Sequence, residues 1–253
     1  MAKKLLICFT ILFLIGGYAE MTSAIDDASL VALWTFDEGS GKTLKDVTGN
    51  GHDGKFIGEP KWVEGKYDGA LEFDGVSSYV EVADSDKLDI TENLTWASWF
   101  KPTLTINSGN ASAYRLMSKN NAYFFLFNYE QIGNLGFLIK SGGDNQFVHS
   151  ETNEWKEGEW YHVVGTYDGK VLRIYINGEL EGEKDHKGSI DASPLTMWIG
   201  ADDLPHYFPG AIDETGVYNR TLDEAEVRNL MNSSAAVEPV GKLTTTWGAI
   251  KCD

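Results

Sequence analysis

Residues 159–179 read EWYHVVGTYDGKVLRIYINGE, and this stretch decides the fold class. In its run 171–176, aliphatic side chains alternate with an arginine and a tyrosine, which is typical of a half-buried β-strand. The run 160–167 precedes it and is equally rich in β-forming residues. Asp168-Gly169 separates the two runs and Asn177-Gly178 follows the second; such pairs accept positive φ angles and favour tight turns. The stretch therefore predicts consecutive antiparallel strands.

The same pattern extends over most of the chain. Asn-Gly or Asp-Gly pairs also stand at 50–51, 53–54, 68–69 and 74–75. Between the turns we expect strands at 30–36, 70–73, 79–82, 94–100, 123–127, 135–139, 160–167, 171–176, 196–199 and 211–218, with a turn back into 179–181. Strands do not alternate with helical patterns, so we expect an all-β antiparallel sandwich or jelly roll rather than an α/β fold.

One short helix is expected near the C-terminal end of this body. Asp223 and Glu226 have the spacing of a capping box, and Leu222 with Val227 has the spacing of a hydrophobic staple. Apolar residues three and four positions after Val227 continue its face of the helix. The pattern indicates a helix that packs on the sandwich.

Composition excludes several classes of function. The chain has 253 residues and a formal net charge of −17, and a strongly acidic protein repels phosphate backbones, so we expect no nucleic-acid partner. Its 2 cysteines exclude a disulfide-dense scaffold and a multi-cysteine zinc module. A hydrophobic content of 42% and an aromatic content of 12% exclude a disordered chain.

The two ends of the sequence differ from the body. Residues 1–24 have a basic start, an apolar run and small residues at Ala19 and Ala24, the pattern of a secretory signal peptide cleaved after either alanine. A permanent N-terminal anchor is the alternative, although the apolar run is short for a membrane span. We expect one domain over 25–234 and a tail over 235–253, in which the roles of Trp247 and Cys252 stay open.

A series of motifs then points to a family. In order, they are ALWTFDEGSG at 32–41, DVTGNGHDG at 46–54, GALEFDG at 69–75, YVEV at 79–82, EWYHVVGTYDG at 159–169, IYING at 174–178, FPGAIDE at 208–214 and VYNR at 217–220. The succession resembles the bacterial LamG-like jelly-roll domain of the laminin G and concanavalin A-like superfamily, over about residues 30–231. The resemblance implies a two-sheet antiparallel sandwich in a secreted or surface protein that binds carbohydrate or protein.

A metal site is the main chemical hypothesis. Asp37 ends the first expected strand, Asp46 follows in a short loop, and Asp213 lies in a late strand that a jelly roll brings beside the first. Flexible shells of oxygen ligands suit Ca²⁺ better than Mg²⁺ or zinc. The resemblance implies a structural calcium whose matching positions are Asp37, Asp46, Gly49, His52 and Asp213, with the turn residues binding through backbone oxygen. The alternative is that the three aspartates only cap turns or strand ends.

Catalysis is disfavoured, and we expect no catalytic residues. Laminarinase-like members of the superfamily use Glu-x-Asp-x-x-Glu on one strand to place the two carboxylates that glycoside hydrolysis needs. The nearest string here, at 72–77, has Ser77 in the last position, and its Asp74-Gly75 predicts a turn. Glycoside hydrolase activity is therefore the least favoured of three functions.

Binding is the favoured function, with a glycan or a cell-surface protein as partner and a monomer as the expected state. Sugar sites combine aromatic rings with amide and charged side chains. The residues favoured as ligand contacts are Tyr114, Asn120, Tyr129, Trp155, His206 and Tyr207. They belong to three clusters that also include Arg115, Asn121 and Tyr123; Gln146 and His149; and Asp202 and Asp203. Trp34, Trp96, Trp99, Trp160 and Trp198 lie in expected strands and are predicted to be core residues.

Overall fold

The computed structural model describes residues 27–109, 114–127, 133–204 and 206–232. The predicted signal peptide and tail lie outside these residues. Within them, the chain forms strands and one helix with the following bounds. The strands are β1 (Leu30–Trp34), β2 (Thr43–Leu44), β3 (Gly54–Ile57), β4 (Lys61–Glu64), β5 (Gly69–Asp74), β6 (Tyr79–Val82), β7 (Leu94–Pro102), β8 (Arg115–Lys119), β9 (Tyr123–Phe127), β10 (Leu135–Ser141), β11 (Asp144–His149), β12 (Tyr161–Tyr167), β13 (Val171–Ile176), β14 (Glu179–Asp185), β15 (Met197–Ile199) and β16 (Pro209–Tyr218). The helix is α1 (Glu224–Asn232).

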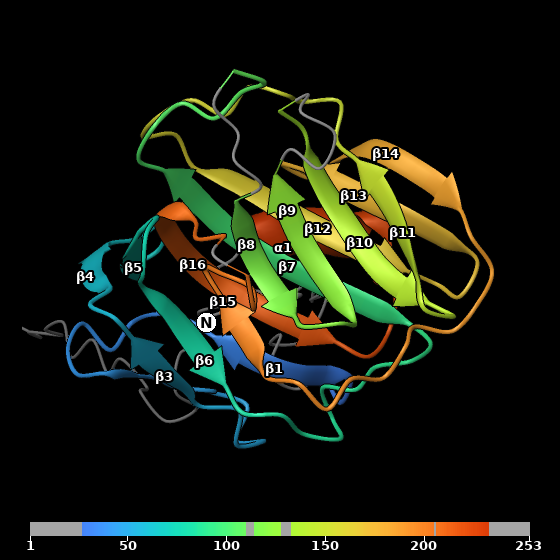
Figure 1. The fold of residues 1–253 in the computed structure, drawn as a ribbon, viewed down its shortest axis with the longest axis horizontal. Helices are drawn as coiled ribbons and strands as arrows, with labels where there is room; N and C mark the ends of the chain where they lie inside the picture. Colours follow the sequence, from blue (N-terminus) through green and yellow to red (C-terminus); the bar gives the residue numbers. More distant parts are fainter. Residues whose placement is uncertain (1–26, 110–113, 128–132, 205, 233–253) are drawn as a thin grey trace, which may run out of the picture.

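The strands form two antiparallel sheets, which confirms the predicted sandwich (Figure 1). The first, named here the β7 sheet, has the order β14-β13-β12-β7-β16-β5-β4, and β1 pairs with β16. The second, the β8 sheet, has the order β11-β10-β9-β8-β15-β6-β3-β2. The first and last strands of the fold are thus neighbours, with Trp34 opposite Thr215, as expected of a jelly roll.

The main core lies between the inner faces of the two sheets. Trp34 and Trp96 are fully buried there, as predicted, and Trp96 makes edge contact with Tyr123. Trp160 and Trp198 are only half-buried, so the prediction that they are core residues is wrong for both. A strand exposes alternate side chains on its two faces, and these two tryptophans lie outside the cluster between the sheets.

The segment 159–179 forms the hairpin that its sequence predicts. β12 and β13 pair antiparallel, and the Oδ1 atom of Asp168 accepts the N–H groups of Lys170 and Val171 in the turn between them. At the next turn, Asn177 and Gly178 both have positive φ, 51° and 80°, which requires residues that tolerate the left-handed region.

The helix begins as predicted. The N–H of Glu226 donates to Asp223 Oδ1 and the N–H of Asp223 donates to Glu226 Oε2, both at 2.9 Å, so the capping box is closed. Leu222 and Val227 are buried in a smaller apolar cluster on the outer face of the β7 sheet, against which Leu230 packs. The helix therefore covers part of that face.

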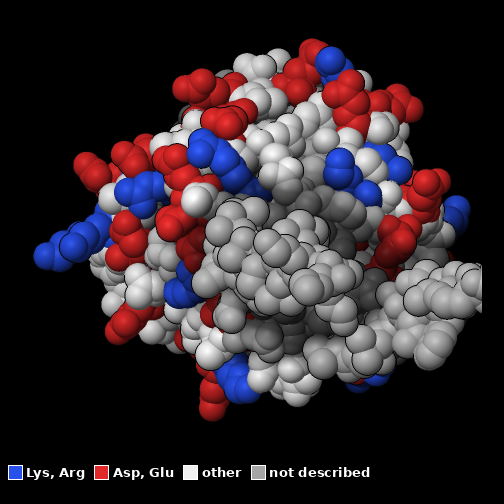
Figure 2. Space-filling view, turned by 180° about the vertical axis from the view of Figure 1, so that it is seen from behind, with Lys and Arg blue, Asp and Glu red and all other residues white. Residues whose placement is uncertain are grey.

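On the face seen from behind, charged side chains of both signs are visible (Figure 2). From behind, Asp and Glu side chains are interleaved with Lys and Arg instead of forming one patch (Figure 2). Among the described residues, no helix is long and apolar enough to cross a membrane.

Candidate functional site

The outer face of the β8 sheet carries a row of side chains that crosses six strands. Strand register places its members opposite one another in the order Glu81, Trp198, Ser118, Phe124, Leu138 and Phe147. Along their strands they alternate with residues of the main core, such as Phe125 and Phe137. Since side chains alternate between the faces of a strand, this outer row points away from the core.

A groove of about 150 Å³ lies on this face, over β8 to β11. Phe124, Leu126 and Leu138 form its apolar floor. Leu126 and Leu138 are only 2% and 4% exposed, although neither belongs to the cluster between the sheets. The remaining lining residues are Arg115, Asn121, Lys140, Asn145, Asp202, Asp203 and Leu204. Six of the ten lining residues are polar or charged, so the groove is more polar than a typical small-ligand pocket, which is lined mostly by apolar side chains.

The loop after β15 forms one wall of the groove, and a buried ion pair fixes it. Arg115 Nε lies 2.6 Å from Asp202 Oδ2, and both side chains are largely buried. Asp202 Oδ1 also accepts the N–H of Leu204 at 2.9 Å, and His206 Nδ1 lies 3.2 Å from both carboxylate oxygens. These contacts hold the wall in place and occupy the Asp202 carboxylate.

Other polar groups of the groove are closer to solvent. Lys140 Nζ donates to Asn121 Oδ1 at 3.3 Å, and this pair is exposed. Asn145 lies opposite Lys140 on β11, and Asp203 is exposed on the wall. An ammonium group, two amides and a carboxylate can together donate to and accept from the hydroxyl groups of a ligand.

An aromatic cluster lies on the same face, formed by Tyr79, Trp198 and Tyr207. The Tyr79 and Trp198 rings are stacked with centroids 4.3 Å apart, and the Tyr207 ring lies 6.2 Å from that of Tyr79. Trp198 Nε1 donates to Thr196 Oγ1 at 2.7 Å. All three aromatic residues of the cluster are half-buried. Burial, with the nearby Glu81 and Tyr207, raises the pKa of Tyr79.

The structure divides the predicted ligand contacts into accessible and inaccessible residues. His206 and Tyr207 are half-buried and lie in the loop between the groove and the aromatic cluster. Trp155 is fully buried and its Nε1 donates to Gly133 O, so it contributes to the core and cannot meet a surface ligand. Asn120 is 2% exposed and accepts from Ser118, which makes it a structural residue. Tyr114 packs against the core.

Tyr129 lies outside the described residues. Of the predicted clusters, the first and third meet at the groove through Arg115 and Asp202. The second cluster does not lie at the groove. Its Gln146 is opposite the core residue Ile139 and therefore shares the inner face of the sheet with it. The His149 ring contacts that of Phe147, at 4.9 Å between centroids.

Sequence reasoning missed the floor of the groove and two rings of the aromatic cluster. The signal was present in the runs 123–127 and 135–139, which are apolar without alternation. An antiparallel strand with apolar residues on both faces must have both faces covered or in use. Such a run indicates either a covering element or a binding surface.

The predicted calcium residues fall into two separate arrangements. In the first, Asp46 is buried and accepts hydrogen bonds from the N–H groups of Leu33, Thr48 and His52. His52 Nδ1 lies 3.2 Å from Asp46 Oδ2, and the His52 carbonyl accepts from Trp34 Nε1 at 2.8 Å. Burial acts to raise the pKa of Asp46, but the hydrogen bonds from His52 and Thr48 outweigh it and hold this pKa well below its usual range. The Asp46 carboxylate and the His52 carbonyl, which the calcium hypothesis assigned as oxygen ligands, thus already accept hydrogen bonds from protein groups.

Gly49 lies in the same loop, in an exposed turn with φ of 77°. Its N–H makes a long hydrogen bond, 3.5 Å, to the carbonyl of Asp46. The loop is therefore stabilised around the Asp46 carboxylate by protein contacts.

The second arrangement contains Asp213 and Asp37. Asp213 is fully buried, and its Oδ2 accepts the N–H groups of Lys66 and Tyr67 at 2.9 and 3.1 Å. Burial raises the pKa of Asp213 to about 7, and the negative charge of Asp37 adds to this effect, whereas backbone N–H groups oppose it. Asp37 is exposed and its Oδ1 accepts the N–H of Gly69.

The second arrangement suits a cation better than the first. Asp213 Oδ1 is buried and has no hydrogen-bond partner of normal geometry among the described residues. A buried carboxylate oxygen left in this state is costly, and a hard cation would satisfy it. No group of three or more His, Cys, Asp and Glu side chains within the described part of the chain is arranged to hold a metal ion.

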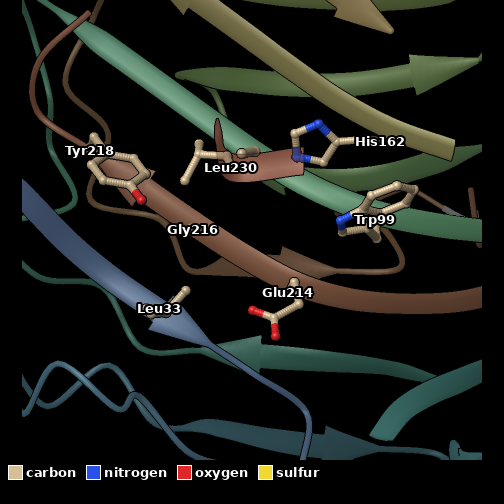
Figure 3. A pocket seen from close by; sticks show the side chains of 8 residues that line it. Leu33, Trp99, His162, Glu214, Gly216, Tyr218 and Leu230 are labelled. Carbon is tan, nitrogen blue, oxygen red and sulfur yellow. The ribbon is translucent and has the colours of Figure 1, made fainter. Parts of the chain in front are cut away.

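A narrow cavity of about 20 Å³ lies between the outer face of the β7 sheet and α1 (Figure 3). Figure 3 shows Leu230 of the helix between Tyr218 on one side and His162 with Trp99 on the other. His162 and Trp99 contact each other with ring centroids 5.0 Å apart. Burial, together with the positive charge of Lys66, lowers the pKa of His162 to about 3. The cavity is lined by a neutral histidine, and the helix contributes Leu230 to one of its sides.

Comparison with curated proteins gives a partial match. Pappalysin-1 of Mus musculus is 28% identical over 102 residues, which is 37% of this chain. The match spans only 6% of the length of that relative. The similarity therefore concerns one module of a much longer protein.

Solved structures with the same fold include the following two. The binding domain of Paraclostridial Mosquitocidal Protein 1 superposes with a TM-score of 0.67 at 18% identity, covering 81% of this chain and 52% of that one. Domain 4 of AbnA, an extracellular GH43 arabinanase of Geobacillus stearothermophilus solved with arabinotriose, gives 0.64 at 21% identity, covering 80% and 98%.

The family model described as the concanavalin A-like lectin/glucanases superfamily matches residues 74–228. This range runs from the end of β5 into α1 and includes every residue of the groove. It covers more than half of the sequence, and its fold agrees with the two antiparallel sheets described above. The chain therefore belongs to the concanavalin A-like lectin/glucanases superfamily.

Proposed function

We propose that the chain is a secreted, non-catalytic module that binds neutral glycans through the groove on the outer face of the β8 sheet. One observation carries the proposal: the half-buried ring of Phe124, with the buried Leu126 and Leu138 beside it, forms an apolar floor on the side of the sheet away from the core. Sugar rings have apolar faces that pack on such a floor, while their hydroxyl groups pair with polar side chains at the rim.

Charge and the structural neighbours support this class of ligand. A net charge of −17 opposes the approach of polyanions, which favours neutral chains. Domain 4 of AbnA has the same fold and was solved with arabinotriose, so arabinan fragments are a suitable first probe. Secretion is proposed from the signal-peptide pattern of residues 1–24.

The test is binding to a glycan array, followed by calorimetric titration with arabinotriose and with each soluble glycan that the array identifies. We expect Phe124→Ala to weaken binding at least tenfold, because it removes a ring from the floor, and Asn145→Ala to weaken it less. Trp160→Ala is the matched control, because Trp160 is also half-buried but lies against Lys101 of the β7 sheet.

Other outcomes would identify a different function. An array that shows no binding to any glycan class would contradict the proposal and favour a protein partner. Release of reducing sugar from a bound glycan would revive an enzymatic function.

The string 72–77, which came nearest to a hydrolase motif, is unsuited to a catalytic pair. Its Asp74 carboxylate accepts the N–H groups of Val76, Ser77 and Ser78 in a turn.

We also propose that a structural calcium stabilises the module, with Asp213 and Asp37 as its side-chain ligands. The support is the buried, unsatisfied Oδ1 of Asp213 and the proximity of the Asp37 charge. In this proposal Asp46 and His52 stabilise the 46–54 loop and do not bind the ion. The ion would bind the folded state alone and stabilise it by mass action.

A further inference from the structure

The aromatic cluster has the chemistry of a sugar-binding platform in its own right. The rings of Tyr79 and Trp198 are stacked, and Tyr207 contacts Tyr79 from the loop. All three rings are half-buried on the outer face of the sheet, and none of them belongs to the cluster between the sheets. Packing of the main core therefore does not account for them. Clustered aromatic rings at a surface favour ligands with both an apolar face and a polar edge.

The polar groups around the rings suit hydroxyl groups. Trp198 Nε1 already donates to Thr196, so the indole contributes its ring rather than a donor. The Glu81 carboxylate lies in the same row as Trp198, and Lys55 is opposite Glu81 on β3. A carboxylate, an ammonium group and two phenols beside stacked rings can recognise the hydroxyls of a neutral sugar.

The cluster and the groove are close enough for one ligand. Trp198 and Phe124 occupy the same row, with Ser118 of β8 between them. Neighbouring strands lie about 4.8 Å apart, which puts the two backbones about 10 Å apart. The loop after β15 lies between the two areas, where the fully buried Ser118 donates to Ala201 O, so a ligand that reaches both areas must cross this loop.

We propose that the aromatic cluster is a second glycan subsite, and that one extended neutral oligosaccharide occupies it together with the groove. This inference rests on the proposed function and specifies its ligand. The module would bind the interior of an oligosaccharide that runs across the strands, and not a single terminal sugar. Two linked contacts raise affinity steeply once the ligand is long enough to reach both.

The experiment is titration with arabino-, xylo-, cello- and laminari-oligosaccharides, each as a disaccharide and as an octasaccharide. For the series that binds, we expect the octasaccharide to bind wild type at least tenfold more tightly than the disaccharide, which is too short to reach both areas. Trp198→Ala should abolish this gain. Trp198→Phe, which keeps a ring, should retain most of it, and Trp160→Ala should retain all of it.

The outcomes separate the two proposals. If Trp198→Ala keeps the gain while Phe124→Ala loses binding, the second subsite is wrong and the groove stands. If no glycan of the array and no octasaccharide binds wild type, both proposals are overturned; if the octasaccharide binds no more tightly than the short ligand, only the second subsite is wrong. Thermal unfolding of Trp198→Ala beside Trp160→Ala shows whether the variant is folded, and the Trp198→Phe result decides the question if it is not.

Discussion

At the scale of single residues, Asp46 and Asp213 have opposite environments, although the sequence predicted both as ligands of one calcium ion. Asp46 is surrounded by donors, including the Thr48 hydroxyl at 2.7 Å, and its pKa lies well below the usual range. Asp213 is buried with fewer donors, and its pKa rises to about 7. A carboxylate already satisfied by N–H and O–H groups gains little from a cation, whereas an unsatisfied one gains much.

Asp46→Asn is expected to destabilise the protein by about 3 kcal/mol, because the amide nitrogen would face buried N–H donors and leave them unsatisfied. Urea unfolding measures the change. Asp185→Asn makes the same chemical change at an exposed position on β14 and should alter the free energy of unfolding little. Equal effects of the two substitutions would show that the Asp46 contacts contribute nothing specific.

His162 gives a prediction about pH. Burial lowers the pKa of His162 from 6.5 to about 3 in the folded state, and the charge of Lys66 contributes. Glu214 lines the same cavity. The folded state therefore binds fewer protons than the unfolded state below pH 6.5, and stability falls as pH falls through this window. Between pH 7 and 5 the wild type should lose roughly 2 kcal/mol that His162→Phe keeps. Urea unfolding across this range tests it, and parallel curves for the two proteins would contradict it.

At the scale of elements, the helix cap allows a matched pair of variants. Asp223→Ala removes the acceptor of the Glu226 N–H, and loss of an N-cap costs about 1 kcal/mol. Asp223→Asn keeps a side-chain oxygen and should lose only a fraction of this. Denaturant unfolding compares them, and an alanine variant as stable as the asparagine variant would show that packing of Leu222 and Val227 alone holds the helix.

The strands that sequence predicted well are those with a clear pattern of their own. The bounds expected for β6, β9 and β13 agree with the structure, because alternating or continuous β-forming runs end there at turns. β4 and β11 were missed, since their sequences, KWVE and DNQFVH, are short or polar. Such strands form because a neighbour offers a partner, here β5 and β10, and that information lies elsewhere in the chain.

The candidate site was predictable only in part, for the same physical reason. Arg115 and Asp202 were both selected, but their pairing depends on β8 and β15 being neighbours in the sheet, which no local pattern reveals. Trp198 was assigned to the core because it lies in a strand; the face to which it points depends on the register of β15 with β6 and β8. Sequence thus identifies which residues can bind, and the sheet order decides which of them meet.

At the scale of the whole molecule, the first and last strands close the fold. β1 pairs with β16, Asp37 follows β1, and Asp213 lies within β16. Three non-glycine residues with positive φ lie near this junction: Phe36, Asp68 and Glu214. Strained backbone of this kind persists where surrounding contacts fix it and is common at ligand sites. An ion bound by Asp37 and Asp213 would link segments from opposite ends of the domain.

Calcium should therefore raise the melting temperature of the whole domain. At a concentration 100-fold above its dissociation constant, the stabilisation is about 2.7 kcal/mol, which for a domain of this size is a rise of about 5 to 10 °C. Asp213→Asn should abolish the rise, and in EGTA it should be at least as stable as wild type, because a neutral amide replaces a carboxyl whose pKa burial has raised to about 7. Asp46→Asn should melt lower with and without calcium yet keep the calcium-dependent rise. Calorimetry of the three proteins in calcium and in EGTA distinguishes the sites: loss of the rise in Asp46→Asn but not in Asp213→Asn would place the ion in the 46–54 loop, and an unchanged wild-type transition would eliminate a structural calcium altogether.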